Sequence, residues 1–180
     1  LKEALGDKVN VVVKNASNDP QTCTTIVNGF LADKVDLIMA NATPALQAAA
    51  AATNTVPILG TSVTDYASAL EIDNWSGTVG GNISGTSDLA PLDQQAAMLQ
   101  ELFPNAKKVG LLFCSSEANS KYQVDEVTKL LTAAGLTCTE FSFTDSNDVS
   151  SVTQSACDNS DVIFIPTDNT AASNTEAIAN

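Results

Sequence analysis

Residues 108–143 of the chain, KVGLLFCSSEANSKYQVDEVTKLLTAAGLTCTEFSF, indicate the fold within one stretch. The apolar run Lys108–Phe113 predicts a buried strand, and Thr137–Phe143 predicts a second strand. Between them, Asn119–Ala134 has the spacing of an amphipathic helix, and Gly135 stands where that helix should end. A strand, a helix and a strand in this order predict two parallel strands joined by a crossover helix.

The same alternation of short β-branched runs and longer amphipathic segments extends over the rest of the chain. Further strands are expected at Val9–Lys14, Asp36–Ala40, Val56–Leu59 and Asp161–Ile165. Further helices are expected at Pro20–Asp33, Pro44–Ala52, Pro91–Leu102 and Val149–Cys157. Asp19 and Thr43 each precede a proline, so each is expected to cap the helix that follows. We therefore expect an α/β fold with parallel sheets flanked by helices.

The segment from Gly60 to Asp88 differs from the rest because it is rich in Gly, Ser, Thr, Asp and Asn. A loop of this length is unusual inside one compact domain, so we interpret it as a crossover between two lobes. We place the boundary near Val79–Asn82. It divides the chain into an N-terminal lobe, residues 1–80, and a second lobe, residues 81–180.

The two halves also resemble each other in sequence. Gly6 and Ser17-Asn18-Asp19 recur 129 positions later as Gly135 and Ser146-Asn147-Asp148, around an expected strand of the same length. Further along, Asp36-Leu37-Ile38-Met39 resembles Asp161-Val162-Ile163-Phe164. Chance matching of common residues is the alternative, but a structural duplication would produce two similar Rossmann-like lobes.

The composition excludes several classes of function. Eight Lys and Arg stand against 21 Asp and Glu, so a net charge of −13 argues against nucleic acid as a partner. The absence of His removes the commonest general acid or base and the commonest metal ligand. We therefore expect no catalytic residue, no metal and no cofactor. No apolar run approaches the roughly 18 to 20 residues needed to cross a bilayer.

The glycines and cysteines carry no motif that would indicate a cofactor. Gly80, Gly81 and Gly85 lack the strand, loop and helix order of a dinucleotide fingerprint. The four cysteines, Cys23, Cys114, Cys138 and Cys157, lack the C-x-x-C pairs of redox or zinc sites, so we expect buried free thiols. A disulfide between Cys114 and Cys138, on neighbouring expected strands, is the alternative.

Polar loops follow several expected strands, at residues 41–44, 61–65, 115–120 and 167–170, and a fifth polar cluster lies at 84–88. In a doubly wound sheet, ligands lie beyond the carboxyl ends of the strands. Each loop could simply cap a helix, but together they would converge on one crevice. The candidate ligand-binding residues are Asn41, Ala42, Thr43, Thr64, Asp65, Ser87, Asp88, Ser116, Glu117, Asn119, Ser120, Asp168 and Asn169.

Five short stretches resemble one known family: Ala40-Asn41-Ala42-Thr43-Pro44-Ala45, Ser62-Val63-Thr64-Asp65, Gly85-Thr86-Ser87-Asp88, Glu117-Ala118-Asn119-Ser120 and Thr167-Asp168-Asn169-Thr170. In this order they resemble the ABC-transporter substrate-binding proteins of type I periplasmic-binding-protein fold, of the tryptophan or tyrosine transport-system type. This chain has Tyr66 where that family often has proline.

The resemblance implies two lobes that close around a small solute, an aromatic or other apolar amino acid, with no chemistry of their own. Asp168, Asp88 and Glu117 would hold its ammonium group. The amide and hydroxyl groups of Ala42, Thr43, Ser87, Ser116 and Ser120 would hold its carboxylate. It also implies an extracytoplasmic monomer, periplasmic or a cell-surface lipoprotein, that docks on a membrane permease. By the same resemblance, the first lobe lacks its opening strand and the second lobe is incomplete at its C-terminal end.

Two other functions stay open from the sequence. A ligand-sensing domain of a receptor or regulator would use the same fold, and an adjoining membrane or DNA-binding segment would favour it. A flavodoxin-like or Rossmann-like enzyme would instead copurify with a flavin or nucleotide.

Overall fold

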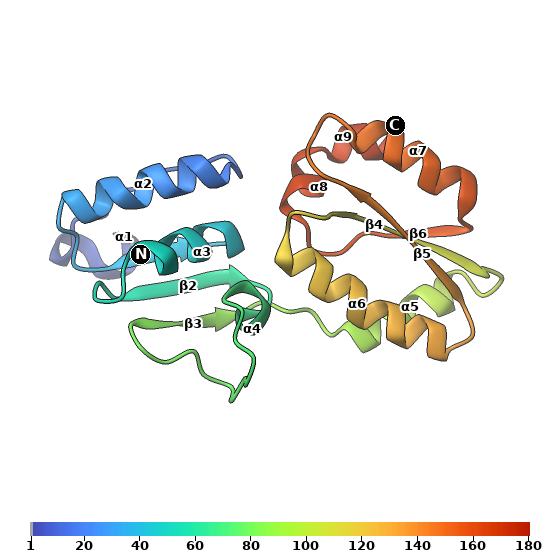
Figure 1. Cartoon of the computed structure of the whole chain (residues 1–180), viewed down its shortest axis with the longest axis horizontal. Coiled ribbons are helices and arrows are strands. Elements are labelled where there is room, and N and C mark those ends of the chain that lie inside the picture. The colour runs from blue at the N-terminus through green and yellow to red at the C-terminus, as the bar shows by residue number, and fades with distance from the viewer. Residues whose placement is uncertain (1) are drawn as a thin grey trace.

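The computed structural model describes residues 2–180 as two lobes, each built on a three-stranded parallel sheet (Figure 1). The first sheet has the order β1-β2-β3, with β1 (Ile38–Asn41), β2 (Ile58–Val63) and β3 (Ile83–Ser87). The second has the order β5-β4-β6, with β4 (Lys108–Cys114), β5 (Thr137–Phe143) and β6 (Val162–Phe164). The expected α/β fold with parallel sheets is confirmed.

Helices flank both sheets. The first lobe carries α1 (Lys2–Leu5), the 3-10 turn η1 (Gly6–Lys8), α2 (Pro20–Ala32), α3 (Thr43–Ala52) and α4 (Tyr66–Ala69). The second lobe carries α5 (Leu92–Leu102), α6 (Ala118–Ala133), α7 (Val149–Asn159), α8 (Asn169–Ser173) and α9 (Thr175–Ala179). No helix in residues 2–180 has both the length and the apolar character that a membrane span requires.

The core of the second lobe is organised around its central strand, β4. Val109, Leu111 and Phe113 pack on the side of α5 and α6, whereas Leu112 and Cys114 pack on the side of α7. Because β4 is buried on both faces, its sequence is an almost continuous apolar run, as is usual for a central parallel strand.

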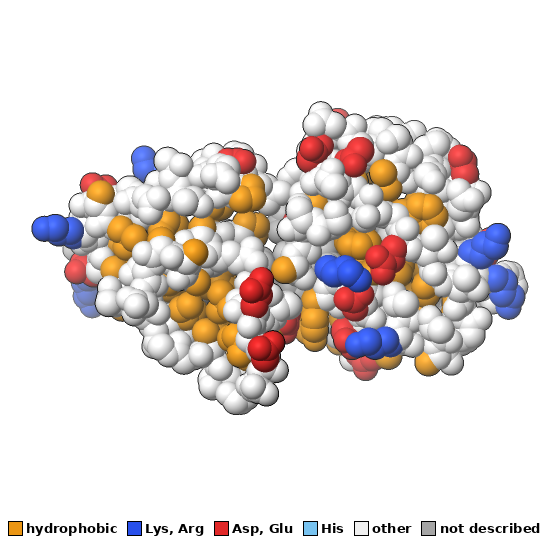
Figure 2. All heavy atoms as spheres, in the orientation of Figure 1, with side chains coloured by type: hydrophobic (Ala, Val, Ile, Leu, Met, Phe, Trp, Pro, Cys, Tyr) orange, Lys and Arg blue, Asp and Glu red, His pale blue; other side chains and the backbone are white. Residues whose placement is uncertain are grey.

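The first lobe covers only one face of its sheet well. Ile38 and Ile58 pack with α2 and α3 on that face. On the other face, Leu37, Met39 and Leu59 are 47%, 48% and 42% exposed. Figure 2 shows apolar side chains at the surface of the first lobe around β2 and β3. A sheet face of this kind usually packs against a helix.

Two strand predictions in the first lobe were wrong. The segment 9–14 forms no strand, since it pairs with no strand of residues 2–180, and Val12 and Val13 are 52% and 75% exposed. Conversely, β3 lies inside the polar stretch expected to be a crossover. After Ile83 its side chains are small and exposed, so no apolar pattern marked it. Since β3 pairs with β2, the first sheet extends beyond the boundary expected at residue 80 and ends at Ser87.

The helix caps were predicted with mixed success. Asp19 caps α2 by accepting a hydrogen bond from the Thr22 amide at 2.7 Å, as expected. Thr43 is instead the first residue of α3, and Ala42, whose side chain cannot cap, precedes it. Gly135, at φ +89°, follows the end of α6 as expected.

The cysteines are free thiols. Cys23 and Cys114 are buried, Cys138 is half-buried, and Cys157 is exposed, contrary to the expected burial. Cys114 and Cys138 do lie on neighbouring strands, but Cys114 is opposite Phe143 while Cys138 is opposite Val109. The two thiols therefore lie at opposite ends of the β4–β5 pair, and the alternative of a disulfide is excluded.

Candidate functional site

A cleft of about 560 Å³ opens between the two lobes. The first lobe contributes the starts of α2 and α3, including Ser17, Asp19 and Gln47. The second lobe contributes the loops that follow β4 and β5, including Ser116 and Asp145, together with α8. The cleft thus lies where strand ends lead into helices, the usual place for a ligand in this type of fold.

Helix α6 begins at the cleft. Ala118 and Asn119, its first two residues, and the preceding Ser116 line the cavity. The residue before the helix, Glu117, does not cap it through its side chain. The first amides of this 16-residue helix therefore lack both an intrahelical partner and a side-chain cap, a setting that suits an anion.

Glu117 holds α8 against the start of α6. Its Oε1 accepts hydrogen bonds from the Thr170 amide at 2.8 Å and from the Thr170 hydroxyl at 2.7 Å. Its Oε2 accepts from the Asn169 amide at 3.0 Å, from Asn169 Nδ2 at 2.7 Å and from Asn119 Nδ2 at 3.1 Å. Five donors to one buried carboxylate occupy all of its roughly four lone-pair sites. Glu117, a candidate ammonium partner, therefore serves first to join two loops of the second lobe.

The ionisation of Glu117 reflects these contacts. Burial raises the pKa of its carboxyl, but the hydrogen bonds from Asn169, Thr170 and Asn119 outweigh burial and lower the pKa below its usual 4.5. Glu117 is therefore a carboxylate near neutral pH.

Asp168 is also occupied within the second lobe. Its Oδ1 accepts the Ala171 amide at 2.7 Å, which caps α8, and its Oδ2 accepts the Cys114 amide at 2.7 Å. Only 4% of the residue is exposed. Burial raises the pKa of Asp168 above its usual value, although both amides act in the opposite direction. It ties α8 to the end of β4 and has little surface with which to contact a ligand.

Asn119 lines the cleft, and Ser120, the next residue of α6, does not reach it. Asn119 Nδ2 donates to the Thr167 carbonyl at 3.1 Å, and its Oδ1 is buried without a hydrogen-bond partner in the described chain. Ser120 is fully buried and receives a bond from Asn119 Nδ2 at 3.2 Å. These residues hold the loop after β6 in place from the side of α6.

Within residues 2–180, one side-chain hydrogen bond crosses the cleft. Asn18 Nδ2 in the first lobe donates to Thr170 Oγ1 in the second at 3.1 Å. The same Thr170 hydroxyl donates to Glu117, so the interlobe bond continues into the network that fixes α8.

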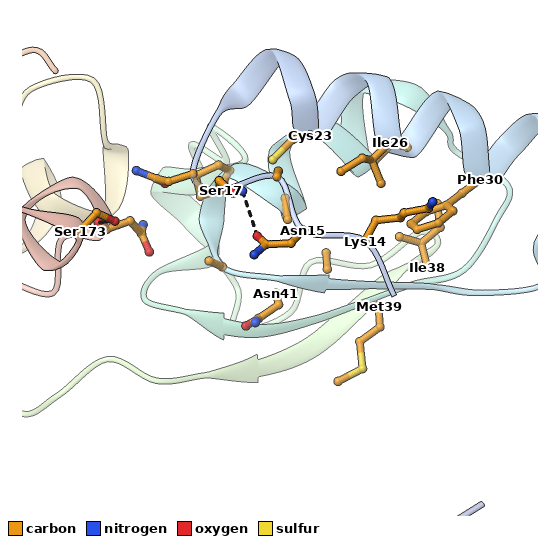
Figure 3. A pocket seen from close by; sticks show the side chains of 18 of the residues that line it. Lys14, Asn15, Ser17, Cys23, Ile26, Phe30, Ile38, Met39, Asn41 and Ser173 are labelled. Carbon is orange, nitrogen blue, oxygen red and sulfur yellow. Dashed lines mark hydrogen bonds between the residues drawn. The ribbon is translucent and has the colours of Figure 1, made fainter. Parts of the chain in front are cut away.

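Three further candidates border a second cavity of about 380 Å³, which lies beside α2 and β1 (Figure 3). They are Asn41, Ala42 and Asn169. Ala42 has φ +75° and ψ 161°, a strained backbone for a residue with a Cβ atom. Thr43, next to it, is buried.

Thr64, Asp65, Ser87 and Asp88 form a separate cluster at the ends of β2 and β3. The Ser87 hydroxyl donates to the Thr64 carbonyl at 2.8 Å, and the Asp88 amide donates to the Val63 carbonyl at 3.0 Å. Asp65 caps α4 by accepting the Ser68 amide at 2.7 Å. None of the four lines either cavity. The structure therefore gathers part of the expected crevice around one cleft and leaves this cluster outside it.

Several residues that line the cleft were not among the candidates. Ser17, Asn18 and Asp19 face it from the first lobe, and Ser146 faces it from the second. These residues belong to the two copies of the internal repeat. The repeat was visible in the sequence, and its position at both sides of the cleft was the signal that could have found them.

The cleft carries negative side chains. Asp19, Glu117 and Asp145 line it, whereas no Lys or Arg of residues 2–180 does. The same part of the chain holds no cluster of three or more metal-binding side chains.

Comparison with known proteins gives a consistent family assignment. Residues 2–180 match the family model described as ABC transporter substrate binding protein. A curated tyrosine-binding protein from Clostridioides difficile (strain R20291) is 38% identical over 164 residues, which are 91% of this chain and 47% of that protein. The chain thus spans about half the length of this relative.

Two solved structures are informative together. A domain from Streptococcus pneumoniae in complex with L-Trp has a TM-score of 0.91 at 33% identity, over 98% of this chain and 62% of that one. The ligand-free, open structure of a substrate-binding protein with adhesive properties from Clostridium difficile has a TM-score of 0.60 at 37% identity, over 97% of this chain and 59% of that one.

Proposed function

The chain belongs to the family of ABC transporter substrate-binding proteins, and from this premise we propose that the full-length protein binds an amino acid in the cleft between its two lobes. The observation that carries the proposal is the cleft itself. It lies between two lobes, each built on a three-stranded parallel sheet, and is lined by loops that lead into helices. Binding there requires no chemistry of the protein, so the protein acts as a carrier and not as an enzyme.

The groups along the cleft suit a zwitterion. The uncapped start of α6 and the Ser116 hydroxyl would hold the carboxylate. The carboxylates of Asp19 and Asp145 would attract the ammonium group. Asp19 has one oxygen that caps α2 and a second with spare capacity. The curated relative is described as a tyrosine-binding protein and the Streptococcus pneumoniae structure holds L-Trp, and we extend this ligand class, aromatic amino acids, to this protein.

Ligand capture would proceed by closure of the lobes. The chain resembles the L-Trp complex far more closely than the ligand-free open structure, although sequence identity and coverage are similar for the two. The difference points to the relative position of the lobes, and the bond from Asn18 to Thr170 is a contact that a closed arrangement would make. Ligand would then shift the population toward this arrangement.

The family also suggests where the protein works. We place it outside the cytoplasm, in the periplasm or as a lipoprotein on the cell surface. There it would deliver its ligand as a monomer to the permease of an ABC transporter.

Calorimetric titration of the full-length protein with L-tryptophan, L-tyrosine, L-phenylalanine and L-leucine tests the ligand class. N-acetyl-L-tryptophan, which lacks the ammonium group, and L-tryptophanamide, which lacks the carboxylate, should each bind at least about tenfold more weakly than L-tryptophan. This ratio corresponds to about 1.4 kcal/mol, within the range of one charge-assisted hydrogen bond. If none of the amino acids bound, the proposal would be rejected.

Asp145→Asn tests the placement of the ligand within the protein. Asp145 lies in the cleft, whereas Asp158 is exposed on α7 and accepts a hydrogen bond from Gln154 one turn away. Asp145→Asn should weaken amino-acid binding about tenfold, and Asp158→Asn should leave it unchanged. Equal affinities for the two variants would move the ammonium site away from Asp145.

A further inference from the structure

Asn119 carries a hydrogen-bond acceptor that the rest of the described chain leaves unused. The residue lines the cleft from the first turn of α6 and is only 2% exposed. Its Oδ1 atom is buried and has no hydrogen-bond partner within residues 2–180. Buried polar atoms in folded proteins are nearly always paired, so an unpaired acceptor on a cleft-lining residue points to a donor that arrives with a ligand.

The orientation of this side-chain amide is fixed by its other end. Asn119 Nδ2 donates to Glu117 Oε2 at 3.1 Å and to the Thr167 carbonyl at 3.1 Å. It also donates to Ser120 Oγ at 3.2 Å. Turning the amide over would place Oδ1 against the Glu117 carboxylate and the Thr167 carbonyl, neither of which has a proton to donate. Oδ1 is therefore a preorganised acceptor.

The kind of donor that suits Oδ1 follows from its burial. The cleft offers an ammonium group better partners, since Asp19 and Asp145 are carboxylates exposed at its surface. The Glu117 carboxylate near Asn119 is already occupied by five donors. A neutral N–H or O–H group loses far less on burial than an ammonium group does. The buried amide oxygen therefore suits a neutral donor, and the exposed carboxylates suit the charged one.

The first lobe presents short apolar side chains to the same cleft. Pro44, Ala48 and Ala51 line it from α3, at spacings that place them on one face of the helix, and Pro20 lines it from α2. No described residue that lines the cleft is aromatic. Such short side chains leave room for a flat ring, but they do not distinguish one ring from another. That distinction requires a polar group, and Asn119 Oδ1 is one that has no other partner in the described chain.

We propose that Asn119 makes the protein select those aromatic amino acids whose ring carries a neutral hydrogen-bond donor. The indole N–H of tryptophan or the phenolic O–H of tyrosine donates to Asn119 Oδ1, whereas phenylalanine leaves that oxygen unpaired. This inference rests on the proposed function, since it requires an aromatic amino acid in the cleft. A site with a buried polar group discriminates strongly against an analogue without the matching group, because only the matching ligand supplies the missing bond.

An isosteric pair of ligands tests the selection. Benzothienyl-L-alanine has the shape of L-tryptophan and the same ammonium and carboxylate groups, but a sulfur atom replaces the indole N–H. In calorimetric titration of the full-length protein, it should bind at least about tenfold more weakly than L-tryptophan. L-phenylalanine should likewise bind at least about tenfold more weakly than L-tyrosine.

The outcomes separate this inference from the proposed function. If L-tryptophan bound and benzothienyl-L-alanine bound equally well or more tightly, the inference would be overturned and the proposed function would stand. If no amino acid bound, both would be rejected. A preference for L-leucine over both L-tryptophan and L-tyrosine would also overturn the inference.

A matched pair of variants assigns the selection to Asn119. Asn119→Ala removes Oδ1 together with the bond from Nδ2 to the Thr167 carbonyl. Gln123→Ala removes a second donor to that carbonyl, Gln123 Nε2 at 3.0 Å, but keeps Asn119 Oδ1. Both variants loosen the same loop, so a purely structural role of Asn119 would affect ligand selection alike in the two.

The quantity to compare is the ratio of the affinities for L-tryptophan and benzothienyl-L-alanine. We expect this ratio to fall to about one in Asn119→Ala and to stay at least about tenfold in Gln123→Ala. A ratio that is unchanged in Asn119→Ala, or that falls equally in both variants, would overturn the inference. The comparison of the two ligands on the wild-type protein requires no variant, so the inference stays testable if Asn119→Ala does not fold.

Discussion

Replacing Glu117 by glutamine tests how firmly the second lobe fixes its side of the cleft. Glutamine keeps the shape of the side chain but turns one accepting oxygen into an NH₂ donor. Whichever oxygen is replaced, the new donor faces at least two existing donors, because Oε1 accepts two bonds and Oε2 accepts three. The Thr170 hydroxyl can rotate away, whereas the amides of Asn169 and Thr170 cannot.

The size of the effect follows from these contacts. Hydrogen bonds to a charged group stabilise a protein by about 1.5–3 kcal/mol each. The bonds share one acceptor and are not additive, so we expect Glu117→Gln to reduce the free energy of unfolding by about 3–4 kcal/mol. This is a large part of the roughly 5–15 kcal/mol typical of a folded protein.

The effect should depend on pH in a defined direction. Burial raises the pKa of Glu117, but the hydrogen bonds of the carboxylate outweigh burial and lower the pKa below 4.5 in the folded state. A depressed pKa means that the stabilisation is complete above the unfolded pKa and is lost as pH falls through the folded one. The difference between wild type and Glu117→Gln should therefore be constant from about pH 6 to 8 and shrink below about pH 4.5.

Urea denaturation followed by circular dichroism, from pH 3 to pH 8, measures both quantities. Glu126→Gln is the matched control, because Glu126 pairs with Lys129 on the exposed surface of α6 at 2.6 Å. Such a surface pair contributes about 0–1 kcal/mol. If Glu117→Gln cost less than about 1 kcal/mol at neutral pH, or if its cost did not shrink in acid, the role assigned to the carboxylate would be wrong.

Three further predictions concern other contacts. In Gly85→Ala the new Cβ would lie 2.1 Å from Tyr66 Oη and 2.3 Å from the Gly60 carbonyl oxygen. Urea denaturation should therefore show a free energy of unfolding at least about 3 kcal/mol lower than that of the wild type. In the control Gly29→Ala the new Cβ has nothing within 4 Å, so the free energy of unfolding should rise by up to about 1 kcal/mol. Asp168→Asn should lower the free energy of unfolding by about 1–2 kcal/mol at pH 7, less than Glu117→Gln does. Burial already raises the pKa of Asp168, so its charge contributes less, and the asparagine oxygen can still accept a hydrogen bond from one of the two amides, Ala171 or Cys114. Asn18→Ala removes the interlobe bond, so calorimetry on the full-length protein should show about two- to tenfold weaker amino-acid binding, and small-angle scattering should show a more open form without ligand.

The strands and the three long helices of the second lobe were predicted from sequence to within about two residues, although α8 and α9 were not, whereas two strands of the first lobe were predicted wrongly. In the second lobe each strand has its neighbours within the chain, so apolar runs such as Lys108–Phe113 report actual burial. In the first lobe, Val9–Lys14 has the composition of a strand but pairs with no strand of residues 2–180. Conversely, β3 is a strand through its pairing with β2 and not through its own side chains. Strand formation depends on partners, and a pattern within one segment does not show whether they are present.

The site was predicted only in outline, for a different physical reason. Loops after strands were expected to supply polar groups for a ligand, and of the candidates in the loop after β4, Ser116, Glu117 and Asn119 line the cleft. Which members of such a loop face a ligand depends on side-chain direction, which composition does not encode. The Ser87 hydroxyl, for example, donates to the Thr64 carbonyl, and both residues lie outside the two cavities.

Helix caps and ligand sites use the same short polar side chains. A capping residue is therefore distinguished from a ligand-binding residue by its hydrogen-bond partners in the structure. Glu117 and Asp168 are buried, and their oxygens are bonded to amides of their own lobe. A ligand could recruit them only by displacing those amides, which would then lack partners at a cost of about 1–3 kcal/mol each. Asp145 is exposed at the cleft, and recruiting it costs no such contact within the core. Ligand affinity should therefore respond more strongly to Asp145 than to Asp168, and stability should respond more strongly to Asp168 than to Asp145.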